Sequence, residues 1–429
     1  MRILIVGAYG LVGGYVGSRL IREGHEVIGA GRDIVTAARR FPAIRWVAID
    51  LRVARASDWM NLLSGVDAVV NCAGALQDSP RDDLQAVHGD STAALAEACI
   101  ATRTRRFVQI SAAGVDRVQS RFGKTKRAAD EALAAFDLEW VVLRPGLILA
   151  PAAYGGSALL RGLAGFPAFI PALDADALVQ TVSVEDVAEA VSLAIAPDAP
   201  TRIICDLVAD ESTRLRDVLT ALRAWLGFPA APVARVPRGI GCLAAWGADG
   251  LSWLGWRSPM RSAALDQLAN GVFGATANAK EHLDLTLRSL AETLAQWPSG
   301  VQDRWHARLY FVKPLLLASL ALFWVASGVI GLGRHDAAAA LLTEAGMGVD
   351  VAQALVLAGS VMDIVLGMLV CARRTAPQAL MGMLLVTAAY LAGSLLWLPQ
   401  LWIDPLGPML KSVVSALAAL TALAMMSER

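Results

Sequence analysis

The chain has 429 residues, of which 56% are hydrophobic and only 18% are charged, and its 38 basic and 38 acidic side chains cancel to a net charge of +0. Its mean hydropathy of +0.51 exceeds that of ordinary soluble chains, so the composition predicts membrane-embedded segments. A neutral chain without a basic stripe has no field that would attract nucleic acid, and we exclude that partner. The length predicts two or three domains.

The five cysteines and five histidines are scattered along the chain. They form no CxxC pair and no other spacing typical of metal ligands. The sequence therefore predicts no metal site and no disulfide framework, and we expect free thiols in a reducing compartment.

The first residues indicate a strand followed by a phosphate-binding turn. Arg2 to Val6 reads as a short apolar strand, and the glycines that follow form the pattern GxxGxxG ahead of a helical pattern. Such glycines let the backbone turn tightly against a phosphate, while the helix start supplies free N–H groups and the positive end of its dipole. We predict that a dinucleotide pyrophosphate binds at Gly7, Tyr9, Gly10, Leu11, Val12 and Gly13.

A second strand, from Glu26 to Gly31, ends at Arg32 about 20 residues after the glycines. Dinucleotide-binding folds place there either an acid for the ribose 2′-OH or an arginine for a 2′-phosphate. Because the arginine comes first, the sequence favours NADP(H). NAD(H) stays possible, since Asp33 follows and could bind a ribose.

Strand patterns recur at residues 45–51, 67–74, 105–114 and 138–146, with helical patterns between them, notably at 91–101 and 124–136. This alternation predicts an α/β fold, a Rossmann-like doubly wound parallel sheet with helices on both faces. Ligands of such sheets bind at the carboxyl ends of the strands. Those ends carry Asp50, Ala73, Gly74 and Ser111.

Over residues 1–295 the chain resembles the short-chain dehydrogenase/reductase superfamily. The motifs are the glycine pattern, Asp50 with Leu51, NCAG at 71–74, ISA at 110–112, Lys126, LRPG at 143–146 and VSVEDVAEAV at 182–191. The branch it resembles is the atypical, extended one that includes sugar-nucleotide epimerase-like proteins and the NAD(P)H-binding accessory subunit of respiratory complex I. The resemblance implies that Asp50 and Leu51 flank the adenine and that Ala73 and Gly74 line the cofactor. It also implies catalytic roles for Ser111, facing the substrate, and for Lys126, holding the nicotinamide ribose.

The departure from this pattern is Phe122, four residues before Lys126 in the stretch SRFGKTKRAADEAL. Members that act on carbinols have a tyrosine there, whose phenol exchanges a proton with the substrate. Three explanations stay open: the site only binds nucleotide, or it reduces an acceptor that needs no protein phenol, such as a quinone or a flavin-like compound, or another group substitutes. Tyr154 is the nearest candidate by sequence, although a loop aromatic covering the pocket is the simpler interpretation.

Residues 201–300 form a second region, expected to be a helical cap on the substrate side. Its stretch at 211–227 predicts an amphipathic helix that ends at Gly227. The next apolar stretch contains Trp246, Trp253 and Trp256 among four arginines, Arg235, Arg238, Arg257 and Arg261. Tryptophan flanked by arginine is typical of a helix at a membrane surface. The alternative is that these tryptophans pack into the soluble core.

Residues 301–429 read as a membrane domain with four spans, at 309–332, 351–372, 379–398 and 406–426. Basic residues flank one side of the spans, namely Arg304, Arg308, Lys313, Arg373, Arg374 and Arg429. The positive-inside tendency therefore predicts a multi-pass protein of the inner (cytoplasmic) membrane with both termini in the cytoplasm. The stretches LYFVKPLLLASLALFWVASG, GSVMDIVLG and WIDPLGPMLK are similar to the DoxX-like family, four-helix membrane proteins associated with quinone or thiol redox functions.

Asp363 falls near the middle of the second span, where a carboxylate is costly unless it faces a protein or water-filled interior. Lys411 in the fourth span is a possible counter-charge. The alternative is a protonated, hydrogen-bonded carboxyl group that helps the helices pack.

A nucleotide-binding domain fused to membrane spans brings a hydride carrier near lipid-soluble acceptors. We therefore expect an NAD(P)H-linked membrane redox protein acting on a quinone-like or lipid substrate. The competing class is a nucleotide-sensing assembly factor without catalysis. An epimerase or dehydratase for sugar nucleotides is the third candidate, which Phe122 disfavours.

Overall fold

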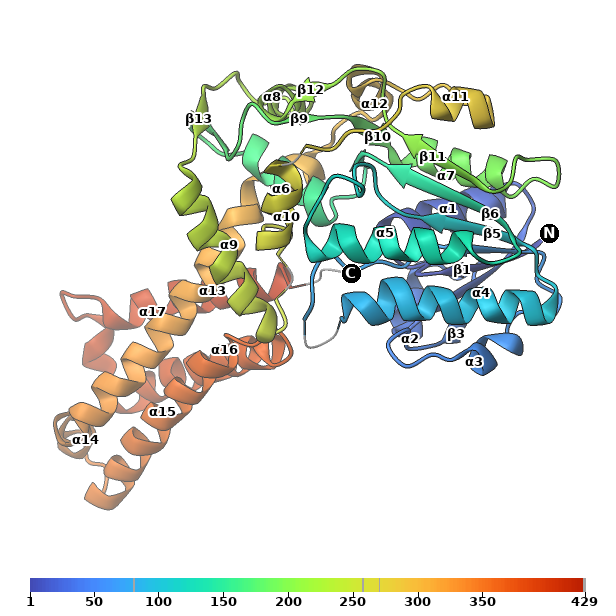
Figure 1. Ribbon diagram of the computed structural model, residues 1–429. Coiled ribbons are helices and arrows are strands. Elements are labelled where there is room, and N and C mark those ends of the chain that lie inside the picture. The colour runs from blue at the N-terminus through green and yellow to red at the C-terminus, as the bar shows by residue number, and fades with distance from the viewer. Residues whose placement is uncertain (80–81, 257, 270, 427–429) are drawn as a thin grey trace. The chain divides into compact units, whose positions relative to one another are not determined.

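The computed structural model describes residues 1–79, 82–256, 258–269 and 271–426 (Figure 1). These form two compact units. The first unit comprises Met1–Asp249 and Ser258–Arg308, and the second comprises Gly250–Arg257 and Leu309–Arg429. Arg257 and Arg429, which the sequence offered as flanking charges, lie outside the described residues.

A seven-stranded parallel sheet forms the centre of the first unit, in the order β11-β6-β5-β4-β1-β2-β3. Its strands are short, continuous apolar runs such as Ile3–Val6, which are buried because helices cover both faces. This confirms the doubly wound parallel sheet predicted from the sequence. The strands are β1 (Arg2–Val6), β2 (Glu26–Gly31), β3 (Arg45–Ala48), β4 (Ala68–Asn71), β5 (Arg106–Ile110), β6 (Glu139–Pro145) and β11 (Ile203–Leu207).

Two helical layers sandwich this sheet (Figure 1). On one face, Val16, Leu20 and Val191 pack on the strands from α1 (Leu11–Arg22) and α7 (Val184–Ala194), and α11 (Asn278–Leu283) lies beside them. On the other face, Trp59, Leu95 and Leu133 pack from α3 (Ala56–Met60), α4 (Ser91–Thr102) and α5 (Arg121–Ala134). A π-helical turn, η1 (Gln85–Asp90), leads directly into α4.

The first unit also has a separate apolar core, built on Leu160, Leu219 and Trp297. As predicted, residues 211–227 contain an amphipathic helix, α8, and Gly227 follows it with a φ of +73°. Three two-stranded sheets pair β7 (Leu147–Leu149) with β10 (Thr181–Ser183), β9 (Leu178–Val179) with β12 (Thr213–Arg214), and β8 (Ile170–Ala172) with β13 (Val233–Arg235). The remaining helices are α2 (Ile34–Arg40), α6 (Gly155–Ala164), α8 (Leu215–Trp225), α9 (Arg238–Trp253), α10 (Ser262–Ala269) and α12 (Leu290–Gln296).

The last residues of the first unit are bound tightly to α6 and α8. Nη1 of the buried Arg161 lies 2.8 Å from Oδ1 of Asp303. A Cβ atom added to Gly165 would lie 2.6 Å from Cβ of Ala307, so this glycine lets the two backbones approach closely. The indole Nε1 of Trp225 donates to the carbonyl of Trp297.

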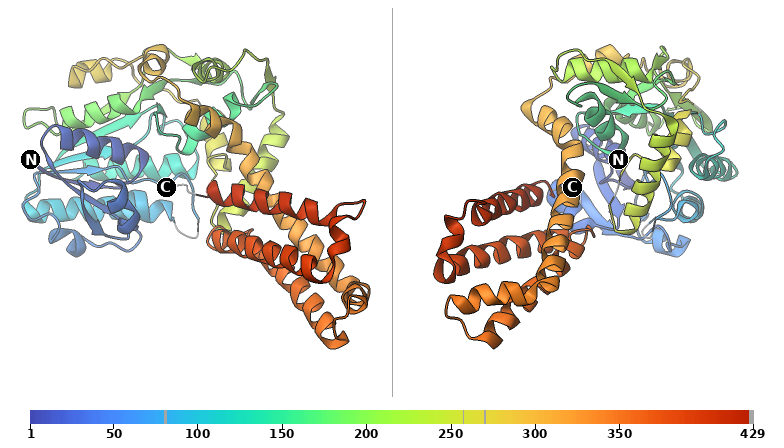
Figure 2. Two further views of the ribbon diagram at one scale, coloured as in Figure 1. Left: turned by 180° about the vertical axis from the view of Figure 1, so that it is seen from behind. Right: turned by 90° about the vertical axis from the view of Figure 1, so that its left-hand side faces the viewer.

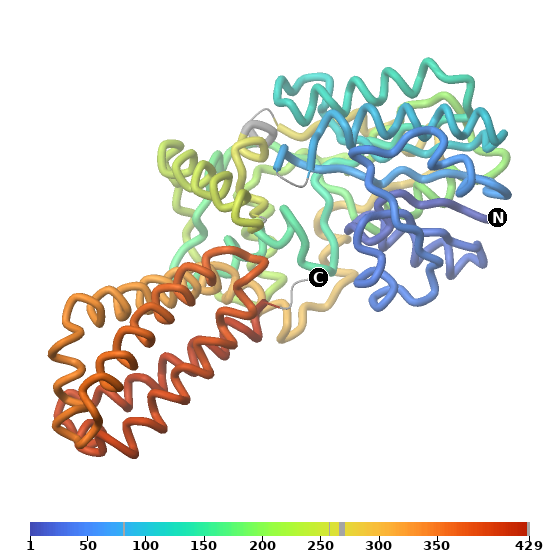
Figure 3. Tube along the Cα trace, turned by 90° about the horizontal axis from the view of Figure 1, so that it is seen from below, coloured from blue at the N-terminus to red at the C-terminus, as the bar shows by residue number. Residues whose placement is uncertain are grey.

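The second unit is helical (Figures 2 and 3). Its α15 packs beside α14 and α16, and α16 packs beside α17. The helices are α13 (Val301–Gly333), α14 (His335–Glu344), α15 (Val349–Leu369), α16 (Ala376–Trp397), η2 (Pro399–Trp402) and α17 (Pro408–Ala424).

Three of these helices, α13, α15 and α16, are long and apolar enough to cross a membrane. The sequence predicted four spans, and the fourth is shorter than expected: α17 has 17 residues. Its start is set locally, because Gly407 adopts a φ of +57° and Pro408 occupies the first helical position. At its other end the helix stops at Ala424.

Candidate functional site

The turn after β1 needs glycine, because its backbone packs closely on itself. Gly7 has a φ of +75°, and a Cβ atom added to Gly13 would lie 2.4 Å from the carbonyl oxygen of Gly7. Gly10 caps α1 without a side chain, so no side-chain acceptor occupies the N–H groups of Leu11 and Val12. This arrangement suits a pyrophosphate at the positive end of the helix.

The end of β2 is covered by Tyr9. An added Cβ atom on Gly31 would lie 2.2 Å from Cε1 of this ring, so only glycine fits beneath it. The backbone N–H of Arg32 lies 3.4 Å from the hydroxyl of Tyr9, and Nη2 of Arg32 lies 2.6 Å from Oδ1 of Asp82. Asp33 caps α2 by accepting from the N–H of Thr36 at 3.2 Å. A 2′-phosphate at Arg32 would therefore have to compete with the Asp82 carboxylate.

The end of β3 carries Asp50 and Leu51. Nη2 of Arg52 lies 2.6 Å from Oδ2 of Asp50, and these hydrogen bonds hold the pKa of Asp50 below its usual range. Leu51 is half-buried and packs against the apolar core on the α3–α4 face of the sheet. Asp50 therefore carries a negative charge that is shared with Arg52.

The turn after β4 is set by the buried Asn71. Its Oδ1 accepts from the N–H of Ala73 at 3.1 Å, while its Nδ2 donates to Oε1 of Gln109 on β5 at 2.9 Å. A Cβ atom added to Gly74 would lie 3.4 Å from Nζ of Lys126 and 3.6 Å from Nε2 of His88. This turn thus brings together two side chains from distant parts of the sequence.

Lys126 on α5 is buried and fixed. Its Nζ donates to the carbonyls of Ile110 at 2.9 Å and Ala73 at 3.3 Å, which uses two of its three N–H groups. Burial lowers the pKa of Lys126 to about 8, although the carboxylate of Asp130 acts in the opposite direction. The lysine therefore has the geometry of a clamp at the carboxyl ends of β4 and β5.

His88 in η1 was missed in the sequence, because nothing in its spacing relates it to Lys126. Its Nε2 accepts from the N–H of Ala75 at 3.1 Å, so the ring proton lies on Nδ1 and is donated to Oγ1 of Thr125 at 2.9 Å. Burial and the charge of Lys126 lower the pKa of His88 to about 2, which keeps the ring neutral. This ring meets Phe122 edge-on, with 5.7 Å between centroids. A phenyl ring backed by a neutral imidazole occupies the place expected for a phenol.

Ser111 lies in a different setting from the one expected. Its hydroxyl donates to Oδ2 of Asp130 at 2.7 Å, and Nε of Arg144 donates to the same oxygen at 3.1 Å. Ser111 is buried, whereas its neighbour Ala112 is partly exposed. Asp130 follows Lys126 by four residues on one helix face, a signal that sequence reasoning could have used. The hydroxyl proton of Ser111 is thus engaged within the core.

Tyr154, the alternative proton donor, lies at the start of α6. Its backbone N–H and carbonyl both bond the hydroxyl of Ser157, at 3.3 and 2.8 Å. These bonds make Tyr154 a helix-capping residue, in keeping with its interpretation as a loop aromatic.

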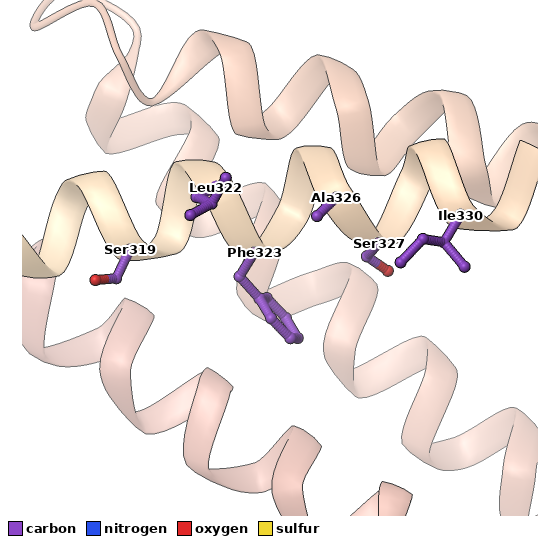
Figure 4. Close-up of a pocket in the computed structure, with 6 residues that line it drawn as sticks. All are labelled: Ser319, Leu322, Phe323, Ala326, Ser327 and Ile330. Carbon is purple, nitrogen blue, oxygen red and sulfur yellow. The ribbon is translucent and has the colours of Figure 1, made fainter.

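A second polar cluster lies within the second unit. The buried carboxylate of Asp363 on α15 accepts hydrogen bonds from Ser327 on α13 and Tyr390 on α16, each at 3.0 Å. No ion pair joins it to Lys411, although both residues belong to the described part of the chain, so two hydroxyls take the place of the expected counter-charge. Ser327 also borders a groove of about 500 Å³ on one side of α13 (Figure 4), lined by Ser319, Leu322, Phe323, Ala326, Ser327 and Ile330.

Comparison with protein families finds two matching regions in the chain. Residues 7–196 match a family described as NAD(P)H-binding, and residues 321–421 match the DoxX-like family. The chain therefore joins an NAD(P)-binding domain to a DoxX-like domain.

The matches to curated relatives cover less than half of the chain. An uncharacterised protein of Mycobacterium tuberculosis is 31% identical over 191 residues, which are 43% of this chain and 19% of that protein. The ceramide reductase of Caulobacter vibrioides is 28% identical over 187 residues, 43% of this chain and 58% of the reductase. The matched region thus spans about a fifth of the mycobacterial protein and little more than half of the reductase.

Solved structures with a similar fold include sugar-nucleotide enzymes. The UDP-glucuronic acid 4-epimerase of Bacillus cereus, in complex with UDP-glucuronic acid and NAD, is 16% identical with a TM-score of 0.53, and the match covers 72% of this chain and 100% of the epimerase. The Bordetella bronchiseptica enzyme WbmG, in complex with NAD, is 17% identical with a TM-score of 0.52, covering 69% and 92%. At these identities the likeness concerns the fold alone.

Proposed function

We propose that this protein is a membrane-anchored NAD(P)H-dependent reductase of the short-chain dehydrogenase/reductase type, whose acceptor is a quinone-like or other lipid-soluble compound. The observation that carries the proposal is the combination of a buried, fixed Lys126 with Phe122 in place of the phenol, in a chain that also has a DoxX-like membrane domain.

The residues present fit a dinucleotide. Gly7, Gly10 and Gly13 would bind the pyrophosphate at the start of α1, with Tyr9, Leu11 and Val12 around it. Arg32, Asp50 and Leu51 would border the adenosine. Ala73, Gly74 and Lys126 would hold the nicotinamide ribose. A bound reduced nicotinamide supplies a hydride.

The surroundings of Phe122 decide which acceptors suit the site. Phe122 cannot donate a proton, and His88 is neutral with both ring nitrogens engaged. A quinone-like acceptor suits such a site, because its reduced oxygen can take a proton from water after the hydride arrives. The ammonium of Lys126, with its lowered pKa of about 8, is the acid that this site offers to other acceptors.

A lipid acceptor agrees with two further observations. The DoxX-like domain contains helices that are long and apolar enough to cross a membrane. The relative from Caulobacter vibrioides is named for reduction of a lipid, ceramide. We therefore infer that the acceptor belongs to the membrane phase.

The second candidate is a nucleotide-sensing assembly factor. It is favoured by the absence of a phenol at Phe122 together with the engagement of the Ser111 hydroxyl by Asp130. Such a protein would bind NAD(P)H through Lys126 and the glycine turn without turnover. The sugar-nucleotide chemistry of the structural relatives is less suited to a site without the phenol.

The two candidates are separated by stopped-flow absorbance of the full-length protein in nanodiscs, mixed with NADPH or NADH with and without a short-chain quinone. Oxidation of bound NAD(P)H that requires the quinone would support the reductase. Tight binding without oxidation, in the original protein and in Phe122→Tyr alike, would favour the sensor and contradict the reductase. Comparison of NADPH with NADH tests the preference assigned to Arg32.

A further inference from the structure

Helix α9 buries small residues and exposes large apolar ones, the opposite of a surface helix in a soluble protein. Its buried face carries small residues, Gly241, Ala245, Ala248 and Ser252, spaced four, three and four apart. A Cβ atom added to Gly241 would lie 2.7 Å from Cδ1 of Leu173, so glycine lets this face of α9 pack closely beside that side chain.

The opposite face of α9 carries large apolar side chains that are exposed. Leu243, Trp246 and Trp253 are 68%, 67% and 78% exposed, and Ile240 is 60% exposed. In water such a face is unfavourable, since each large side chain forgoes about 1.5–3 kcal/mol of burial. The alternative that these tryptophans pack into the soluble core is therefore wrong for Trp246 and Trp253.

The chain that follows α9 is fixed to a turn between two membrane-capable helices. The N–H of Arg373 donates to the carbonyl of Leu254 at 2.9 Å, and Nε1 of Trp256 donates to the carbonyl of Cys371 at 2.6 Å. The guanidinium of Arg373 also lies over the Trp256 ring, 5.8 Å from its centroid. This turn joins α15 to α16, two helices that are long and apolar enough to cross a membrane. The segment that follows α9 is therefore fixed where two membrane-capable helices meet.

The arginines at the start of α9 are engaged with carboxylates. Nη2 of Arg235 lies 2.6 Å from Oδ2 of Asp176, and Nε of Arg238 lies 2.9 Å from Oδ1 of Asp174. The charges of these two arginines are therefore paired with carboxylates. Association of α9 with a bilayer should depend on its apolar side chains more than on anionic headgroups.

A chain of polar contacts leads from α9 to Arg121, the neighbour of Phe122. Near the end of α9, Oδ1 of Asp249 lies 3.0 Å from Nε of Arg261, which also donates to the carbonyl of Asp78 at 3.1 Å. The carboxylate of Asp78 in turn lies 2.9 Å from Nη1 of Arg121, the neighbour of Phe122.

We propose that α9 lies in the interface between bilayer and water, with Leu243, Trp246 and Trp253 among the lipid headgroups. The substrate of the site beside Phe122 then enters from that membrane surface. The second statement rests on the proposed reductase function, whereas the position of α9 does not.

The position of α9 is tested by spin labels on the full-length protein in phosphatidylcholine nanodiscs, after replacement of the exposed Cys242 and Cys371 by serine. Labels at Leu243→Cys and Trp246→Cys are expected to be accessible to oxygen and protected from a water-soluble nickel chelate. A label at Glu97→Cys on the exposed side of α4 is the control and should show the opposite pattern. Nickel accessibility at 243 and 246 equal to that at 97 would overturn the proposal. Protection from both reagents with dipolar broadening would also overturn it, since a second copy of the chain would then cover the face.

The origin of the substrate is tested with Leu243→Ser/Trp246→Ser, which leaves the nucleotide site untouched. We expect KM for a long-chain quinone in the bilayer to rise about tenfold or more, with unchanged NADPH affinity and unchanged KM for a water-soluble quinone. An equal KM for both acceptors would refute entry from the membrane. If the original protein reduces neither acceptor, the reductase proposal fails, while the label experiment still decides the position of α9.

Discussion

Lys126 and its neighbour Lys124 offer a matched pair on α5. Lys126 is buried with two carbonyl partners, whereas Lys124 is exposed. Replacing Lys126 by methionine removes the charge and the donors while keeping most of the side-chain volume. We expect NADPH affinity to fall about tenfold or more, measured by fluorescence titration, and Lys124→Met to bind normally. Equal affinity in both variants would show that the clamp does not reach the cofactor.

His88 makes the stability of the first unit depend on pH. Its pKa is about 2 in the folded chain against 6.5 for a free histidine, so below pH 6.5 His88 is protonated in the unfolded chain but stays neutral in the folded chain. The neutral His88 therefore has no destabilising effect above pH 6.5. Below pH 6.5 the free energy of unfolding falls by up to about 1.4 kcal/mol per pH unit as the pH drops toward 2.

The measurement is the temperature at which NADPH binding is lost, followed between about pH 5 and 7.5. His88→Asn should be less stable at neutral pH, because its side chain fills the site poorly, but it should show a flatter pH dependence. His282→Gln on α11 serves as the control and should retain the original slope. An unchanged slope in His88→Asn would assign the acid sensitivity to another group.

At the residue scale the positions of the glycine turn after β1 and of Lys126 beside the strand ends followed from local patterns, while their binding roles stay predictions. The sequence could not predict the His88–Thr125 bond, which joins residues 37 positions apart and depends on the π-helical turn η1. It was also unable to show that Ser111 would bond Asp130, because a serine directly after a strand can face either the ligand or the core. Burial and side-chain direction are properties of the packed structure.

At the element scale, α13 and α15 approach closely through glycine. A Cβ atom on Gly328 would lie 2.4 Å from the carbonyl oxygen of Ser360, whereas nothing lies within 4 Å of one on Gly333 in the same helix. In a bilayer the hydrophobic effect does not drive helices together, so their association depends on the close packing that small residues permit. Gly328→Leu should therefore destabilise the second unit by about 1–3 kcal/mol.

Thermal unfolding in detergent, followed by size-exclusion chromatography of the heated sample, measures this effect. Gly333→Leu has the same added volume on the same helix and should behave like the original protein. If both variants lose the monodisperse peak at the same temperature, the contact between α13 and α15 does not limit stability.

Elements with a strong period were predicted well, and those without one were not. The parallel strands are short apolar runs bounded by turn residues, so their existence followed from sequence. The helix at the fourth predicted span is shorter than 406–426, since hydropathy continues across these residues whereas Gly407 and Pro408 set where the helix starts. For α9, composition could not tell which face would be buried, because both faces are free of charge over most of their length.

At the scale of the whole molecule, the charges that flank the spans predict its orientation. Arg373 and Arg374 lie in the turn between α15 and α16, beside the exposed Cys371, while the turn before α15 contains Gly348. We expect the nucleotide-binding unit and this arginine turn on the cytoplasmic side of the inner membrane.

Labelling with a membrane-impermeant maleimide on intact cells tests this orientation. A cysteine introduced at Gly348 should react from outside, whereas Cys371 should react only after lysis. A tag after Arg429 is expected to be protected in intact cells if the short α17 crosses the membrane. Labelling of Cys371 from outside would reverse the orientation, and an accessible tag would show that α17 does not span.

The contacts of Asp303 and Ala307 determine where a fragment of the first unit can end without losing stability. A fragment ending near residue 300, at the boundary that composition suggests, would lose both residues and leave the Arg161 guanidinium buried without its carboxylate, at a cost of about 3–5 kcal/mol. The same cut would expose the surface beside Gly165 that Ala307 covers. A fragment extended to Arg308 keeps both contacts. The first unit therefore includes the first two turns of α13, a helix that is long and apolar enough to cross a membrane.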